Sequence, residues 1–399
     1  MVCYVVVNMV PYHAARLRAV ASLGAFQVCV LQLRKHDPFR ALEFNNEETG
    51  FRTHTLPPPQ TWAANSLRTQ ISEALHALAP GVVCLNGWGL PGSLSVAEWC
   101  LANRKPMILL SDSSERDLPR KWPSELFKSL IVRACRAALV GGSRNEDYLV
   151  KLGMPRDRVF LGYDVVDNDH FAEGASEARR QAQSERARLG LPPEYFLICS
   201  RFSVKKNIPM VITAYARYHT LTTRPWPLIL VGGGELRPLL SGLVESLGLQ
   251  GSVTLAGEKG YSELPAYYGL AGCFIQASTT EQWGLVINEA MAAGLPILAS
   301  ERCGCSPELV QDDVNGYVFD PTDSGRLAHL MQRVAADSDL RKRFGEASAS
   351  LISKWDPRRF ATGLVSAVRV CQGEGRRHNA TIDRLLIRGL AYARDRRMI

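Results

Sequence analysis

The sequence lacks the hallmarks of several protein classes. No stretch approaches the roughly 20 consecutive apolar residues that a membrane-spanning helix requires. Residues 1–7 carry neither a basic leader nor a small-residue cleavage site, so we expect them to form a first strand. Internal repeats, low-complexity tracts and nucleic-acid-binding motifs are also missing. The sequence therefore predicts neither a membrane-spanning, a repeat nor a nucleic-acid-binding protein.

Cysteine is present but not in a spacing that predicts a disulfide framework or a metal site. The ten cysteines are scattered, and the one close pair, Cys303 and Cys305, lacks zinc-finger spacing. Most of the others lie in apolar runs, where a thiol behaves as a small buried hydrophobe. We therefore expect no metal, and a reducing compartment such as the cytoplasm.

The length and the charge narrow the class of protein further. A chain of 399 residues favours two domains, and 46% hydrophobic with 22% charged residues is a normal globular balance. The net charge of +8 suits nucleic acid, an anionic membrane or phosphorylated substrates. Without a nucleic-acid motif, the membrane and phosphorylated substrates stay open, beside a surface that is merely basic.

Short apolar runs alternate with amphipathic helical segments in both halves. This alternation predicts α/β domains with parallel sheets covered on both faces. Ligands of such sheets bind beyond the carboxyl ends of the strands. The expected helices include Ser93–Asn103, Ser124–Arg133, Met210–Tyr218, Leu236–Leu247 and Arg326–Ala335. The expected strands are Cys3–Val10, Phe26–Leu33, Val82–Leu85, Met107–Leu110, Ala137–Val140, Val159–Gly162, Phe196–Ser200, Leu228–Val231, Val253–Ala256, Cys273–Gln276, Ile297–Ala299 and Tyr317–Phe319.

The segment Ser278–Gly294 carries the richest chemistry. A strand ends near Ser278, and a helix begins near Gly284. The first N–H groups of that helix would form an anion-binding site. Because glycine has no side chain, a phosphate could approach the backbone closely there. Glu281 lies in the turn, where it suits a sugar hydroxyl, and Glu289 lies inside the helix, where it suits the vicinal hydroxyls of a ribose. The alternative is that Glu281 caps the helix and Glu289 is solvated.

Two further loops follow predicted strands. Arg201 and Lys206 suit the negative charges of a diphosphate, or are two solvated cations. The turn Val231–Arg237 contains three glycines but has Arg237 where a dinucleotide fingerprint has its third glycine, which argues against an NAD site. A close turn around Gly233 that leaves room for a nucleotide fits better.

Together these motifs resemble the retaining glycosyltransferases of family four, the "glycosyl transferases group one" type with the GT-B fold. The resemblance covers residues 196–355, and the segment Asp164–Phe171 resembles the family's Asn-Gly-Val-Asp element. The motifs that carry it are Arg201-x4-Lys206, the triple-glycine turn, Gly257, Glu281-x7-Glu289, Ser306–Val310 and Asn315-Gly316.

The resemblance implies two Rossmann-like, doubly wound domains that face each other across a cleft. We expect an acceptor-binding domain over residues 1–171, a surface linker or connecting helix over the polar segment 172–193, and a nucleotide-sugar-binding domain over 194–355. Residues 356–399 would then be helices that pack back on the first domain.

The resemblance also implies roles for individual residues. Arg201 and Lys206, with the amides of Leu285 and Val286, would hold the donor diphosphate. Glu289 would bind the ribose and Glu281 the transferred sugar. The catalytic set would be Glu281, Lys206 and Arg201, and the remaining donor contacts would come from Gly233, Glu258, Lys259 and Gly284.

The implied reaction moves a hexose from a UDP- or GDP-sugar to a glycan or lipid-linked acceptor, with retention and with neither metal nor cofactor. This implies a role in cell-envelope polysaccharide biosynthesis, in the cytoplasm or at the inner face of the membrane. A nucleotide-sugar epimerase or a phosphorylase on the same fold stays open. So does a non-catalytic scaffold, against which the complete set of charged motif residues argues.

The first half departs from the family. The loop Asn8–His13 lacks the family's glycine pair, and Ser111-Asp112 stands where many members have a histidine. Acceptor-side candidates are His13, Trp88 and Asp112. The alternatives are a structural or solvated histidine, a packed tryptophan and an aspartate that caps the next turn.

Basic residues mix with aromatic ones between Arg116 and Arg136, a composition that suits contact with anionic membrane or a solvated helix face. The tail Arg376–Arg397 adds an arginine-rich amphipathic pattern that we expect to pack on the first domain.

Overall fold

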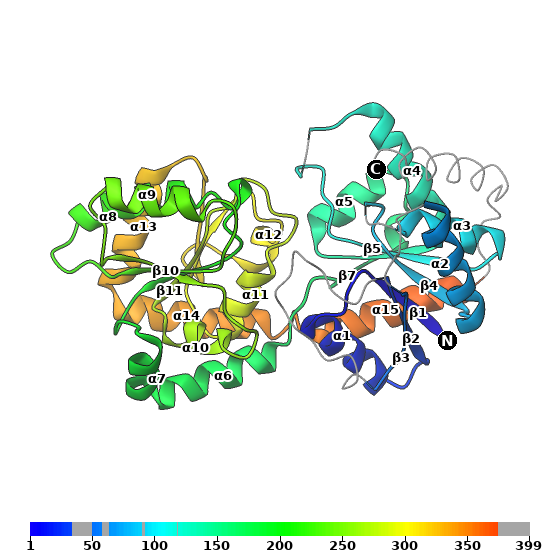
Figure 1. Ribbon diagram of the computed structural model, residues 1–399, viewed down its shortest axis with the longest axis horizontal. Helices are drawn as coiled ribbons and strands as arrows, with labels where there is room; N and C mark the ends of the chain where they lie inside the picture. The colour runs from blue at the N-terminus through cyan, green and yellow to red at the C-terminus, as the bar shows by residue number, and fades with distance from the viewer. Residues whose placement is uncertain (34–49, 58–63, 90–91, 118, 374–399) are drawn as a thin grey trace. The chain divides into compact units, whose positions relative to one another are not determined.

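The computed structural model describes residues 1–33, 50–57, 64–89, 92–117 and 119–373. The chain divides into two compact units (Figure 1). Unit 1 comprises Met1–Asp164 together with the segment that begins at Pro357, and unit 2 comprises Val165–Asp356. Each unit has a parallel β-sheet with helices on both faces, so the predicted doubly wound α/β architecture is confirmed.

The sheet of unit 1 has the strand order β3-β2-β1-β4-β5-β6-β7. Helices α1 and α15 pack against each other on one face, while α2 and α3 pack together on the other (Figure 1). The order reverses between β1 and β4, which is where an open sheet of this kind leaves room for a ligand. The elements of unit 1 are β1 Val2–Val6, α1 Pro11–Ser22, β2 Val28–Gln32, β3 Arg52–Thr55, α2 Ala64–Leu78, β4 Val82–Asn86, α3 Ser93–Ala102, β5 Met107–Ser111, α4 Trp122–Ala134, β6 Ala137–Val140, α5 Ser143–Lys151, the 3-10 turn Arg156–Arg158, β7 Val159–Leu161 and α15 Pro357–Gln372.

The sheet of unit 2 has the order β10-β9-β8-β11-β12-β13, with the reversal between β8 and β11. Residues of α8, α9 and α13 share one buried apolar cluster with the sheet, while α6, α10 and α11 pack together elsewhere in the unit. The elements of unit 2 are α6 Asn168–Arg180, α7 Ala182–Leu189, β8 Phe196–Cys199, the 3-10 turn Val204–Lys206, α8 Ile208–Thr220, β9 Leu228–Val231, α9 Arg237–Ser246, β10 Val253–Gly257, α10 Leu264–Leu270, β11 Cys273–Gln276, α11 Leu285–Ala292, β12 Ile297–Ser300, α12 Ser306–Leu309, β13 Gly316–Phe319, α13 Ser324–Ala336 and α14 Ser338–Ile352.

The predicted strands coincide with observed ones, and two differences have clear causes. β1 ends at Val6 rather than Val10, because Pro11 opens α1 and the intervening residues form the connecting loop. β3, with the sequence Arg-Thr-His-Thr, was not predicted. It lies at the edge of the sheet, where exposed polar side chains replace the apolar run expected of a central strand.

Residues 172–193, predicted to form a surface linker or connecting helix between two domains, are helical but are part of unit 2. This segment forms most of α6 and all of α7, and both belong to unit 2, which begins at Val165. α6 packs on α10 at very short range, since a Cβ at Gly269 would lie 2.7 Å from the Cα of Ala175. Small residues on both helices allow the contact, and they also remove the large apolar residues by which a buried helix is recognised.

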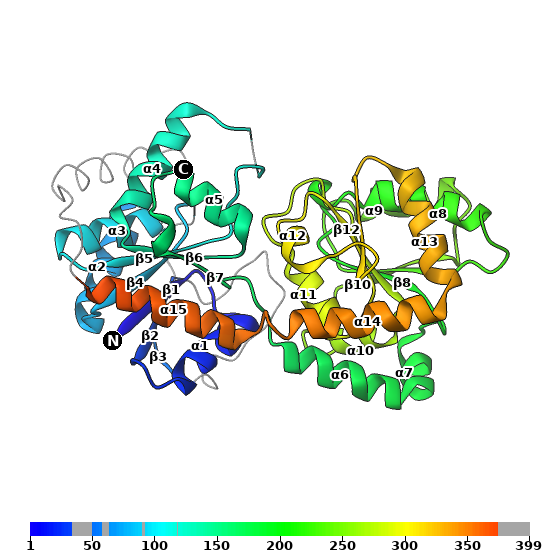
Figure 2. The same cartoon turned by 180° about the vertical axis from the view of Figure 1, so that it is seen from behind.

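The chain returns to unit 1 at Pro357. There α15 lies along the sheet beside α1 (Figure 2), and it buries Phe360, Leu364 and Val368. The Arg376–Arg397 tail lies outside the described residues.

Candidate functional site

The predicted site residues of unit 2 lie in the loops after four neighbouring strands, β10, β9, β8 and β11. Because these strands are parallel, the four loops meet along one edge of the sheet. β8 has β9 on one side and β11 on the other, so the strand order reverses there. The loops after β8 and β11 are joined by a hydrogen bond from the Thr279 N–H to the Lys205 carbonyl at 2.9 Å. This is the position at which doubly wound sheets bind ligands.

Lys206 and Glu281 come from different loops and form an ion pair between Nζ and Oε2. Both side chains are largely buried, at 14% and 12% exposure. Lys206 ends the 3-10 turn that follows β8, whereas Arg201, five residues earlier, is exposed. Burial in an ion pair shows that Lys206 is not the solvated surface cation of the alternative interpretation.

Two buried neutral side chains hold the same oxygen of Glu281. The Ser278 hydroxyl donates to Oε2 at 3.1 Å, and the Gln276 amide donates to it at 3.3 Å. Gln276 also donates to the Ser278 hydroxyl at 2.9 Å, which ties the two donors together. The N-cap of α11 is Gly284 and no side chain caps the helix, so the interpretation of Glu281 as a helix cap is wrong.

Gly284 sets the direction in which α11 begins. Its φ of 107° is one that residues with a Cβ rarely adopt. From there the chain turns into a helix whose first N–H groups, those of Leu285 and Val286, have no carbonyl one turn earlier to bind. Such groups, with the positive end of the helix dipole, form a site for an anion.

Glu289 lies one turn further along α11 and is not the solvated residue of the alternative interpretation. The hydroxyl of Tyr268, on α10, donates to its Oε2 at 2.7 Å. Burial raises the pKa of the carboxyl from 4.5 to about 7, while the hydrogen bond from Tyr268 lowers it. At neutral pH Glu289 therefore exchanges readily between its neutral and ionised forms, and a ligand that donates hydrogen bonds favours the ionised form.

The triple-glycine turn after β9 lies directly on the loop after β8. A Cβ at Gly232 would lie 1.9 Å from the carbonyl oxygen of Ser200, and one at Gly234 would lie 2.7 Å from that of Phe202. The Phe202 N–H also donates to the Gly233 carbonyl at 2.6 Å. The glycines thus allow two backbones to touch next to Arg201.

The loop after β10 extends the site. Oε1 of Glu258 lies 2.6 Å from the place where a Cβ of Gly233 would stand, so the carboxylate covers the glycine turn. The ammonium of Lys259 lies over the ring of Tyr267, 5.5 Å from its centroid. The structure thus brings Glu258 to the triple-glycine turn, and the ammonium of Lys259 contacts Tyr267 of α10.

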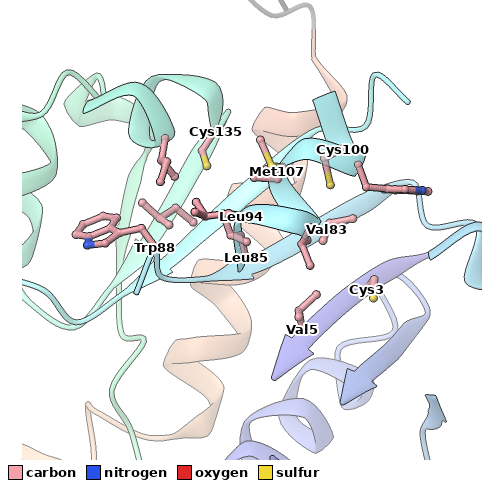
Figure 3. Packing of buried hydrophobic residues seen from close by; sticks show 14 of the residues in the cluster. Cys3, Val5, Val83, Leu85, Trp88, Leu94, Cys100, Met107 and Cys135 are labelled. Carbon is pink, nitrogen blue, oxygen red and sulfur yellow. The ribbon is translucent and has the colours of Figure 1, made fainter. Parts of the chain in front are cut away.

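Two of the three acceptor-side candidates of unit 1 are buried side chains. Trp88 is 8% exposed and lies at one end of an apolar cluster with Leu85 and Leu94 (Figure 3). His13, on α1, is 5% exposed, and its ring meets those of Tyr4 and Tyr12 edge-on. This burial favours packing for both residues.

Asp112 follows β5, and its carbonyl accepts a hydrogen bond from the Asn145 amide at 2.6 Å. Its charge also acts on Asp164: burial and then Asp112 raise the pKa of Asp164 to about 8, and Arg16 opposes them. Asp112 therefore adds negative charge near a buried carboxyl at the end of unit 1.

The basic stretch around α4 is partly neutralised inside unit 1. Lys128 donates to Glu125 at 2.9 Å and to the Tyr148 hydroxyl at 3.0 Å, and Arg120 donates to the same hydroxyl at 2.9 Å. Trp122, in contrast, is 78% exposed, and Leu126, one turn along α4, is 55% exposed. The outward face of this helix is thus more apolar than its composition suggests.

Three residues of the unit 2 site were missed by the sequence analysis: Gln276, Ser278 and Tyr268. In the sequence pattern, Gln276 and Ser278 are indistinguishable from ordinary strand and turn residues at the end of β11. Tyr268 is indistinguishable from an ordinary apolar position of a helix. No spacing relates them to the glutamates they contact.

Across the described ranges no helix is long and apolar enough to cross a membrane. In the same part of the chain no three acidic, histidine or cysteine side chains gather as metal ligands would.

Comparison with known proteins identifies the C-terminal part. Residues 180–350 match the family "Glycosyl transferases group 1". Alpha-D-kanosaminyltransferase of Streptomyces kanamyceticus is 30% identical over 55% of this chain and 56% of its own length. D-inositol 3-phosphate glycosyltransferase of Thermobifida fusca is 31% identical over 71% of this chain and 64% of its own length. The alignments thus span little more than half to just under two thirds of these two relatives.

Solved structures agree on the fold. Anabaena HepE, in a crystal structure with UDP and glucose, superposes with a TM-score of 0.72 at 17% identity, over 92% of this chain and 99% of HepE. At that identity the likeness establishes the fold alone. Residues 180–350 thus match the glycosyl transferases group 1 family, and the chain as a whole has the GT-B fold of these solved structures.

Proposed function

We propose that this chain is a retaining hexosyltransferase that moves a sugar from a nucleotide-diphosphate donor, a UDP- or GDP-sugar, to a glycan or lipid-linked acceptor. One observation carries the proposal: the Lys206–Glu281 pair lies at the strand reversal of unit 2, and Glu281 stands in the loop that leads into α11. The UDP and glucose in the Anabaena structure support a nucleotide sugar as the ligand.

In this proposal the diphosphate replaces Glu281 as the partner of Lys206. The leaving nucleoside diphosphate gains negative charge as the glycosidic bond breaks, and a buried ammonium stabilises that charge more than a solvated one would. The free amides of Leu285 and Val286 add hydrogen bonds, and Arg201 adds a second cation. Glu281, still held by Ser278 and Gln276, then accepts a hydrogen bond from a sugar hydroxyl.

Glu289 binds the ribose in the same proposal. An ionised carboxylate accepts two hydrogen bonds from vicinal hydroxyls, and Glu289 offers this at a half-buried position one turn inside α11. Retention follows when the acceptor attacks from the face that the phosphate leaves and the phosphate takes its proton. This route uses no nucleophile from the protein, and we expect it to need neither metal nor cofactor.

For the acceptor, the proposal names only a chemical class, a phosphorylated or membrane-linked molecule. The name of the Thermobifida relative specifies D-inositol 3-phosphate, and a net charge of +8 suits a phosphorylated or membrane-linked acceptor. Trp122 and Leu126 would enter an anionic membrane surface, with Lys121 exposed beside them. A cytoplasmic location, peripheral at the inner face of the membrane, and a role in envelope polysaccharide synthesis complete the proposal.

The donor site is tested by thermal stability of the purified protein with UDP, GDP, ADP and their common sugar conjugates. We expect one nucleotide family to stabilise the protein, and Lys206→Ala to abolish that stabilisation. Lys205→Ala is the matched control, because Lys205 is the adjacent, exposed lysine. Equal stabilisation of the Lys206 and Lys205 variants would contradict the site. Turnover of the donor without any acceptor would indicate an epimerase, and a requirement for inorganic phosphate would indicate a phosphorylase.

Membrane contact is tested by co-sedimentation with vesicles of anionic or neutral lipid. We expect binding to the anionic vesicles alone, and its loss in Trp122→Ser. Leu239→Ser is the control, since Leu239 is 53% exposed on α9 of unit 2. Undiminished binding of the Trp122 variant would refute this part of the proposal.

A further inference from the structure

Tyr268 is a buried tyrosine of unit 2 whose hydroxyl is directed at a motif glutamate. It lies on α10 and is fully buried. Phe171 of α6 meets its ring edge-on at 5.7 Å between centroids, and Phe274 of β11 contacts it at the same distance. With rings on two sides, the tyrosine side chain has little freedom to turn, and its hydroxyl stays where the packing holds it.

The hydroxyl donates to Oε2 of Glu289 at 2.7 Å, the usual length of a hydrogen bond from a hydroxyl to an oxygen. Among the described residues, this is the hydrogen bond that the structure gives to the Glu289 carboxyl group. Oε2 is thereby held by α10, while the described residues give Oε1 no hydrogen bond. The contact therefore restrains the orientation of the Glu289 carboxyl group.

The surroundings of Glu289 contain little positive charge. The thiol of Cys199, on β8, lies beside both Tyr268 and Glu289 and is neutral, because burial and then Glu289 raise its pKa to about 12. Arg179 of α6, which packs against α11, directs its guanidinium to the Ala293 carbonyl rather than to Glu289.

Other elements near Glu289 are also accounted for. The buried residues of α14, the other helix packed on α11, are uncharged. His170 of α6 stacks on Tyr261, and Lys206 is paired with Glu281. Tyr268 is thus the group that favours the ionised form of Glu289, against the burial that opposes it.

We propose that Tyr268 is a positioning residue of the donor site, which orients the Glu289 carboxylate so that Oε1 faces the ribose hydroxyls of the nucleotide. The proposal rests on the assignment of the nucleotide site above, and it adds a residue that makes no contact with the ligand itself. The proposal predicts a change in how nucleotide affinity depends on pH. Without the tyrosine hydroxyl, Glu289 ionises at a higher pH, so nucleotide affinity is lost at neutral pH and regained in alkali.

The test is Tyr268→Phe, which removes one oxygen atom and keeps the ring. The dissociation constant of whichever nucleotide the wild type binds is measured by calorimetry from pH 6 to pH 9. A hydrogen bond to a charged group predicts a loss of affinity of about tenfold at pH 7 and an upward displacement of the pH profile by about one pH unit. By pH 9 the variant should have regained most of the loss. Tyr215→Phe, whose hydroxyl donates to the Ser252 carbonyl elsewhere in unit 2, should leave the profile unchanged.

If the affinity of Tyr268→Phe changed with pH around the same midpoint as that of the wild type, the inference would be overturned, whether or not the affinity were lower at every pH. The double variant Tyr268→Phe/Glu289→Gln adds a second criterion. If Tyr268 acts through the charge of Glu289, the double variant shows no more loss than Glu289→Gln alone, and additive losses would refute the coupling.

A readout without nucleotide separates this inference from the proposed function. The difference in melting temperature between wild type and Tyr268→Phe should widen as the pH rises through about 7, because the missing hydrogen bond stabilises the ionised carboxylate. If no nucleotide bound the wild type, the proposed function would fail. A difference in melting temperature that widened with pH would still support the contact of Tyr268 with the ionised Glu289, and a constant difference would refute it.

Discussion

Replacing Glu289 with glutamine should make the protein more stable at pH 8, although it removes a proposed ligand-binding charge. Burial holds the pKa of this carboxyl near 7 rather than 4.5, so ionising it in the folded protein is unfavourable. Below pH 4.5 the group is protonated in both the folded and unfolded states and contributes nothing. Between 4.5 and about 7 the unfolded state releases the proton first, so the wild type loses stability as the pH rises.

The size of the effect follows from that interval. At about 1.4 kcal/mol per pH unit, the rise of the Glu289 pKa from 4.5 to about 7 lowers the free energy of unfolding of the wild type by about 3 kcal/mol at and above pH 7. Glutamine has the same shape, carries no charge and still accepts the hydrogen bond from Tyr268. For a domain of the size of unit 2, a gain of this size raises the melting temperature by on the order of 5 to 10 °C.

The assay is thermal unfolding of Glu289→Gln and wild type, measured at intervals from pH 4.5 to pH 8.5. The difference in melting temperature should be near zero at the acid end, grow through the middle of the range and level off above pH 7. Glu245→Gln, an exposed position on α9, is the control and should show no such trend. A difference that does not change with pH would show that burial does not govern the charge of Glu289, and the reasoning would fail.

Two further predictions concern close backbone contacts. Gly232→Ala should destabilise unit 2 by more than about 3 kcal/mol in urea unfolding, because the new Cβ would lie 1.9 Å from the Ser200 carbonyl oxygen at a φ of 135°; an unchanged midpoint would refute the contact. Gly269→Ala should destabilise by about 1 to 3 kcal/mol despite the higher helix propensity of alanine, because its Cβ would meet the backbone of Ala175 on α6. Gly242→Ala on α9 is the control for both, since nothing lies within 4 Å of its Cβ position, and it should stabilise by about 0.5 to 1 kcal/mol.

The sequence by itself determined the architecture and the candidate loops. Alternating apolar runs and amphipathic segments predicted nearly every strand, because strands buried on both faces must be apolar throughout. The motif spacing placed Lys206, Glu281 and Glu289 after strands whose carboxyl ends meet at one edge. These properties depend on residues that are close together in the chain, so they can be recognised from the sequence alone.

Only the tertiary structure decided which side chains touch. Tyr268 is separated from Glu289 by 21 positions, and Lys206 from Glu281 by 75, so no periodicity relates them. The sequence predicted only a linker or connecting helix over most of α6, because close packing against α10 requires alanine and glycine rather than the large apolar residues that mark a buried helix. The charge state of Glu289 likewise depends on burial and on one hydroxyl from another helix, quantities that exist only once the chain has folded.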